Sequence, residues 1–113
     1  MKYFFLISLF FTTTFLAQNK ESLSKNSFDL HLQKGDSLYA MKDYDKALKL
    51  YQNALDISLD NKNINTTALS YKKIGILFYK KKQYPLSENM YRKSFELDSI
   101  SKNAADIQYN IFL

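Results

Sequence analysis

The chain has 113 residues, of which 46% are hydrophobic and 24% are charged, and this composition is typical of one small globular domain. With only two Gly and one Pro it lacks the frequent turn residues of an all-β fold, so long helices joined by short turns are favoured. The absence of Cys excludes a disulfide framework, thiolate metal ligands and thiol catalysis.

The first 17 residues have the organisation of a secretory signal peptide. Lys2 gives a positive start, residues 3–17 carry no charge, and the sequence turns polar at Gln18. A short charged start, an apolar stretch of about 7–15 residues and a small residue at its end are the parts of such a peptide. We therefore predict export, to the periplasm or outside the cell, with cleavage after Ala17. An uncleaved membrane anchor over residues 3–17 is the alternative, although a spanning helix needs about 20 apolar residues.

The segments that follow are predicted to be a polar linker and then a series of helices. Residues 18–27 are the linker, and the helices span about 28–41, 44–59, 64–81 and 84–97, with a last helix from about 101 after a break at Asp98-Ser99. Pro85 then lies in a first helical turn, where its missing N–H costs nothing.

A repeat of six positions organises residues 28–113. The two sets are Gly35, Leu38, Tyr44, Ala47, Tyr51 and Ala54, and Gly75, Phe78, Tyr84, Ser87, Tyr91 and Ser94. Both sets have the same spacing, and His31 and Tyr71 each lie four residues before their glycine. Gly inside a helix costs about 1 kcal/mol relative to Ala, so its recurrence indicates that a second helix packs closely there.

These residues resemble the tetratricopeptide repeat, a helix–turn–helix unit of about 34 residues with the pattern W-x2-L-G-x2-Y, A-x3-F and P. Here Lys34 replaces the Leu before the first glycine, Ser87 replaces the small Ala, and neither repeat ends in Pro. The glycines are 40 residues apart, so the additional six residues predict either a longer loop after Leu59 or an extended helix at the start of repeat two.

The resemblance implies an all-α antiparallel array of about two and a half repeats after the signal peptide. Repeat one covers about 28–61, repeat two about 64–99, and residues 101–113 are a partial repeat or a capping helix. About three repeats are needed to bury a continuous core. The array is therefore marginally stable, or it pairs with something, or the chain is truncated relative to its relatives.

No enzyme, cofactor or metal site is predicted. His31 has no second His or any Cys to share catalysis or metal binding, so a half-buried structural role is favoured. The basic cluster, defined as Lys72, Lys73, Lys80, Lys81 and Lys82, is interpreted as solvated helix-end charge. Nucleic acid is not expected as a partner, because the cluster lacks Arg and base-stacking groups. Membrane contact is limited to an uncleaved signal segment or to this Lys72–Lys82 cluster.

In this family the concave face of the array, lined by the first helix of each repeat, binds a protein or peptide. The corresponding residues here, which we call the groove residues, are Leu32, Asp36, Tyr39, Ala40, Lys72, Ile76, Tyr79 and Lys80. The resemblance thus implies an exported, non-catalytic scaffold or adaptor. The alternative is the N-terminal sensory segment of a longer signalling protein, a kinase or a transcriptional regulator, and self-association is left open.

Overall fold

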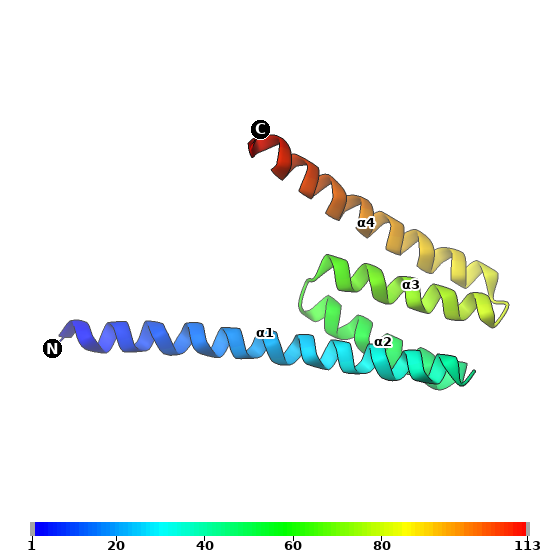
Figure 1. Ribbon diagram of the computed structural model, residues 1–113, viewed down its shortest axis with the longest axis horizontal. Coiled ribbons are helices and arrows are strands. Elements are labelled where there is room, and N and C mark those ends of the chain that lie inside the picture. The colour runs from blue at the N-terminus through cyan, green and yellow to red at the C-terminus, as the bar shows by residue number, and fades with distance from the viewer. Residues whose placement is uncertain (1, 113) are drawn as a thin grey trace.

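Within the described part of the chain, four helices form two antiparallel hairpins, as Figure 1 shows. The computed structural model describes residues 2–112, with side chains at residues 19, 20 and 22–106. The helices are α1 (Lys2–Ala40), α2 (Tyr44–Asp60), α3 (Ile64–Lys80) and α4 (Tyr84–Phe112). Each helix packs against the next one along the chain. The predicted all-α fold of stacked helical hairpins is confirmed.

The three turns between the helices are built in the same way. Lys42, Lys62 and Lys82 follow one another at 20-residue intervals, and each has a left-handed φ of 61°, 53° and 60° respectively. In each turn the N–H of this lysine donates to the carbonyl oxygen three residues earlier, and the N–H of the next residue donates to the carbonyl oxygen five residues earlier. The donor–acceptor pairs are Lys42–Tyr39 and Asp43–Leu38, Lys62–Leu59 and Asn63–Ser58, and Lys82–Tyr79 and Gln83–Phe78. This pairing is the Schellman motif, in which a left-handed residue closes the helix C-terminus.

Two of these turns also cap the helix that follows. The Asp43 carboxylate accepts a hydrogen bond from Lys46 N at 3.4 Å, and the Asn63 amide oxygen accepts one from Thr66 N at 3.1 Å. Because the second turn is as short as the first, the six additional residues lengthen the helices instead of the loop. The second of the two sequence alternatives, an earlier start of α3, is therefore the observed one.

The core lies between the two hairpins. Ala47 and Tyr51 of α2 pack with Ile74 and Leu77 of α3, and each is at most 3% exposed. Gly35 of α1 leaves the room that the Tyr51 ring occupies, since a Cβ built there would lie 2.5 Å from Tyr51 Cε1. The close packing predicted from the repeated glycines is thus present in the first hairpin.

Two helix boundaries differ from those predicted. Helix α1 begins at Lys2 instead of about residue 28, so residues 18–27 are helical, and the side chains of residues 1–17 lie outside the described ones. The predicted break at Asp98-Ser99 is wrong, because α4 runs without interruption to Phe112 and residues 101–112 form no separate helix. Neither region contains Gly or Pro, and the Ser99 hydroxyl donates to Phe95 O at 2.9 Å within the helix.

Within the part of the chain that the structure describes, no helix is long and apolar enough to span a membrane.

Candidate functional site

The groove residues lie on α1 and α3, and Asp36 is the most strongly tied of them to the rest of the fold. Its Oδ1 accepts a hydrogen bond from the Tyr51 hydroxyl at 2.6 Å and lies 3.1 Å from Lys73 Nζ. One carboxylate therefore joins α1, α2 and α3. The side chains of Asp36 and Lys73 are 44% and 31% exposed, so this ion pair is partly screened by solvent.

The same contact changes the acidity of Tyr51. Burial, and then the hydrogen bond and negative charge of Asp36, raise the pKa of the Tyr51 phenol well above its ordinary value of 10.0. The phenol consequently stays protonated and acts as a hydrogen-bond donor to the carboxylate.

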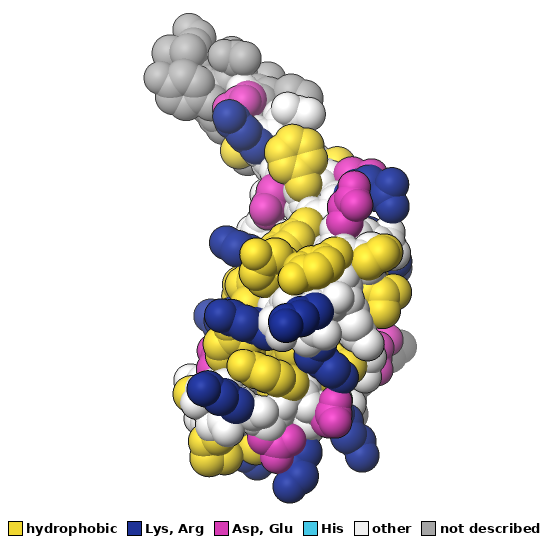
Figure 2. Space-filling view, turned by 90° about the vertical axis from the view of Figure 1, so that its right-hand side faces the viewer, with side chains coloured by type: hydrophobic (Ala, Val, Ile, Leu, Met, Phe, Trp, Pro, Cys, Tyr) yellow, Lys and Arg dark blue, Asp and Glu magenta, His cyan; other side chains and the backbone are white. Residues whose placement is uncertain are grey.

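Two matching aromatic pairs lie beside the turns that join α1 to α2 and α3 to α4. The rings of Tyr39 and Tyr44 are 5.6 Å apart, and those of Tyr79 and Tyr84 are 5.4 Å apart. Tyr79 is 57% exposed, whereas Tyr39 is half-buried against the core. Figure 2 views the end of the molecule that carries these two turns, where hydrophobic side chains lie among positively charged ones.

The remaining groove residues divide by exposure. Leu32 and Ile76 are half-buried, and Leu32 packs against the core, whereas Ala40, Lys72 and Lys80 are exposed. The structure thus brings Asp36, Tyr39 and Leu32 into the packing between helices. Apart from Ala40, the exposed groove residues are the aromatic and cationic ones of α3.

The basic cluster is not uniformly solvated. Lys81 Nζ lies 2.7 Å from Asp45 Oδ1, and Lys73 pairs with Asp36 as described above. Lys72, Lys80 and Lys82 are exposed. Two of the five lysines, Lys73 on α3 and Lys81 directly after it, therefore pair with the first hairpin, and the density of positive charge is lower than the sequence indicates.

His31 is half-buried, as predicted. Its Nδ1 lies 2.8 Å from Ser27 O, and because a carbonyl oxygen can only accept, Nδ1 is the nitrogen that donates. Among the described residues no group of three His, Cys, Asp or Glu side chains could hold a metal ion.

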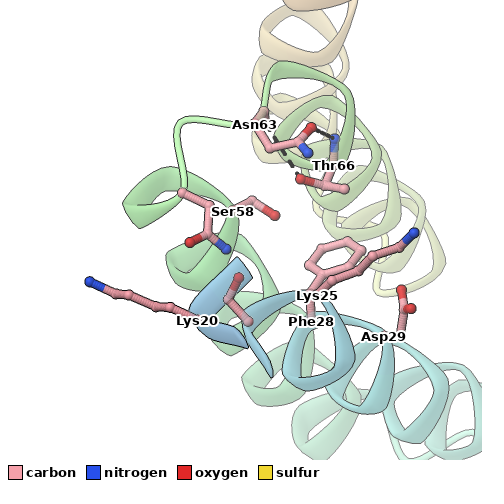
Figure 3. A pocket seen from close by; sticks show the side chains of 9 residues that line it. Lys20, Lys25, Phe28, Asp29, Ser58, Asn63 and Thr66 are labelled. Carbon is pink, nitrogen blue, oxygen red and sulfur yellow. Dashed lines mark hydrogen bonds between the residues drawn. The ribbon is translucent and has the colours of Figure 1, made fainter. Parts of the chain in front are cut away.

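An open pocket of about 530 Å³, which the sequence did not predict, lies between α1, the end of α2 and the start of α3 (Figure 3). It is lined by Lys20, Ser24, Lys25, Phe28, Asp29, Ser58, Asn61, Asn63 and Thr66. Ser58 is 1% exposed, and its hydroxyl has no hydrogen-bond partner among the described residues. The lining mixes both charge signs with amides, so it selects no particular ligand. No local motif could reveal it, because its residues come from three helices.

Comparison with known proteins identifies one match. The family model described as tetratricopeptide repeat matches residues 27–99, which include both glycines and both tyrosine pairs. No curated protein matches the chain significantly, and neither does any solved structure.

Proposed function

Because the chain belongs to the tetratricopeptide-repeat family, we propose that it is an exported, non-catalytic adaptor that binds a segment of a partner protein along α1 and α3. The observation that carries this proposal is the exposed aromatic and cationic surface of α3 beside the Tyr79–Tyr84 pair. Tyr79 is 57% exposed, and Lys72 and Lys80 are exposed on the same helix. Tyrosine is enriched among the residues that dominate protein interfaces.

The charge balance of this surface favours one class of partner segment. Asp36, the only acidic groove residue, is already paired with Lys73, so the uncompensated charge beside Tyr79 is positive. We therefore expect a segment with acidic side chains next to aromatic or aliphatic ones. Rim charges of this kind mainly raise the rate of association and its dependence on salt.

The test is capture of partner proteins from the exported fraction by the full chain. The triple variant Tyr39→Ala/Tyr79→Ala/Lys72→Glu should reduce capture of the principal partner by about tenfold or more. A control, Leu59→Ala/Lys49→Glu, changes one exposed apolar and one exposed cationic side chain on α2 and should leave capture unchanged. Equal capture by all three chains would show that the groove is not the binding surface.

Export is tested separately, by the intact mass of the native product. A mass in the exported fraction that matches a product beginning at Gln18 supports cleavage of the signal segment. A product that keeps residues 1–17 and sediments with membranes would instead support the anchored alternative.

A further inference from the structure

Helix α4 has an apolar face that no helix among the described residues covers. The equivalent face of α2 is covered by α3. Tyr51 of α2 is 2% exposed because α3 packs on it, whereas its counterpart Tyr91 on α4 is 38% exposed. Leu55 of α2 is half-buried against the core, whereas its counterpart Phe95 is 72% exposed. Tyr91 and Phe95 are four residues apart on a helix and therefore share one face.

We propose that α4 of one chain pairs in an antiparallel manner with α4 of a second copy, about a twofold axis at Phe95. This inference goes beyond the proposed function, because it uses α4 and none of the groove residues.

The alternative of head-to-tail stacking, with α1 of a second copy on α4, is disfavoured by the sequence of α1. When α3 covers α2, it contributes Ile74 and Leu77 to the core. The positions of α1 that correspond to them, 40 residues earlier, are Lys34 and Ser37, and both are exposed. At these two positions α1 therefore offers α4 polar side chains in place of the two core residues, although Leu30 and, directly after the helix, Met41, which are 49% and 68% exposed, lie on the same side.

The charges on α4 favour the antiparallel self-pairing. With Phe95 on the twofold axis, a residue a given number of positions before it faces the residue the same number of positions after it in the second copy. Glu88 then faces Lys102 of the second copy, and Arg92 faces Asp98 of the second copy. These residues lie three or seven positions from Phe95, on the same side of the helix. Each pair occurs twice, so the symmetric interface holds four pairs of opposite charge.

Two more pairs fit the same axis. Tyr91 faces Ser99 of the second copy, and Tyr84, which is 53% exposed, faces Asp106 of the second copy, a pairing of phenol and carboxylate. A parallel pairing would instead place each charge against itself. An isologous contact that buries Phe95 and Tyr91 closes on itself and leads to no further growth.

The test is a charge exchange in the full chain, followed by sedimentation equilibrium at low salt. Glu88→Lys places like charges against Lys102 twice and should weaken the dimer about tenfold or more, as should Lys102→Glu. The double variant Glu88→Lys/Lys102→Glu should restore the wild-type dissociation constant. The matched control is Glu96→Lys, an exposed charge on α4 about a quarter turn away from Phe95, which should have little effect.

A monomer at all concentrations would overturn the proposal. So would a dimer that responds equally to Glu88→Lys and Glu96→Lys, or one that the double variant does not restore, because association would then use another surface.

The axis itself is tested with single cysteines, since the chain contains none. A short bis-maleimide should link Phe95→Cys chains into dimers faster than Ile100→Cys chains. Ile100 is also exposed, at 53%, but it points away from the Phe95 face. Equal linking of the two variants would contradict the placement of the axis at Phe95.

Discussion

The two hairpins carry repeat residues at the same spacing, yet these residues are buried to different degrees. The aromatic residue of α2, Tyr51, is 2% exposed and donates to Asp36, whereas the equivalent Tyr91 of α4 is 38% exposed. The difference arises because α3 covers α2, while no helix among the described residues covers the outer face of α4. How deeply a repeat residue is buried therefore depends on the neighbouring repeat as much as on the repeat that contains it.

The hairpins also differ in how their small residues pack. Ala47 and Ala54 of the first hairpin are fully buried and apolar. The corresponding residues of the second are Ser87 and Ser94, whose hydroxyls donate to Gly75 O at 2.7 Å and to Ala68 O at 2.8 Å. The second hairpin thus uses buried hydrogen bonds where the first uses only close packing.

The largest expected effect comes from truncating the two equivalent tyrosines. Tyr51→Ala should lower the free energy of unfolding by about 3–4 kcal/mol, since it empties a core position and leaves the Asp36–Lys73 pair without its hydrogen-bond donor. Tyr91→Ala should cost about 1 kcal/mol, because that ring is already partly solvated. Urea denaturation at dilutions where the chain is monomeric measures both. Equal losses would mean that the hairpins are buried alike.

The glycines offer a second contrast. A Cβ on Gly35 would lie 2.5 Å from Tyr51 Cε1 and 2.7 Å from its Cδ1, whereas one on Gly75 meets its nearest atoms at 3.3 Å. Overpacking against an anchored ring outweighs the gain in helix propensity, so Gly35→Ala should cost about 2 kcal/mol. For Gly75→Ala the two effects nearly cancel, and the change should stay within about 0.5 kcal/mol. Thermal unfolding of the pair gives the comparison directly.

Much of the fold was predictable because it depends on local and periodic signals. The recurrence of Gly35 and Gly75 at 40 residues predicted two hairpins, and Pro85 marked the first turn of α4. The shared turn geometry was not predictable, since a left-handed Lys carries no Gly or Asn signal. The uninterrupted α4 was missed because Asp98-Ser99 was interpreted as a break, although no helix-breaking residue lies there.

The candidate site was less predictable than the fold. Family spacing placed Asp36 on the concave face, but its partner Lys73 is 37 residues away, and only the packed structure shows that the carboxylate is already in use. The pocket beside Ser58 depends in the same way on residues from three helices. Sequence spacing gives the face of a helix, and tertiary contacts decide which side chains on that face remain accessible.

A further prediction concerns the pH dependence of stability, through ionisation of the Tyr51 phenol. Its folded-state pKa is raised above the unfolded value near 10, so this stabilisation is complete below pH 10 and is lost as the pH rises above it. At pH 11 the unfolded state gains about 1.4 kcal/mol from ionisation of this phenol. The wild-type chain should therefore lose that much more stability between pH 9 and 11 than Tyr51→Phe. Parallel losses in the two proteins would rule out Tyr51 as the titrating group.

The buried serines test the difference in polar packing. Ser87→Ala and Ser94→Ala should each cost about 1 kcal/mol, because each removes a buried hydrogen bond from a hydroxyl to a helix carbonyl. Ser58→Ala should be neutral or slightly stabilising, because the Ser58 hydroxyl is buried with no partner among the described residues. A marked loss for Ser58→Ala would show that the hydroxyl has a function in the pocket.

A smaller effect is expected for the residue that precedes each of the helices α2, α3 and α4. Asp43 and Asn63 cap α2 and α3 with side-chain oxygens, and Gln83 occupies the equivalent position before α4. Gln is not among the preferred capping residues, because its longer side chain fits the first helical turn poorly.

Gln83→Asp should raise the free energy of unfolding by about 0.5–1 kcal/mol, through a new cap and a favourable charge at the helix N-terminus. Asp43→Gln should cost a similar amount in the first hairpin. Chemical denaturation of this reciprocal pair would show whether the turns are interchangeable, and opposite shifts of equal size are the expected result.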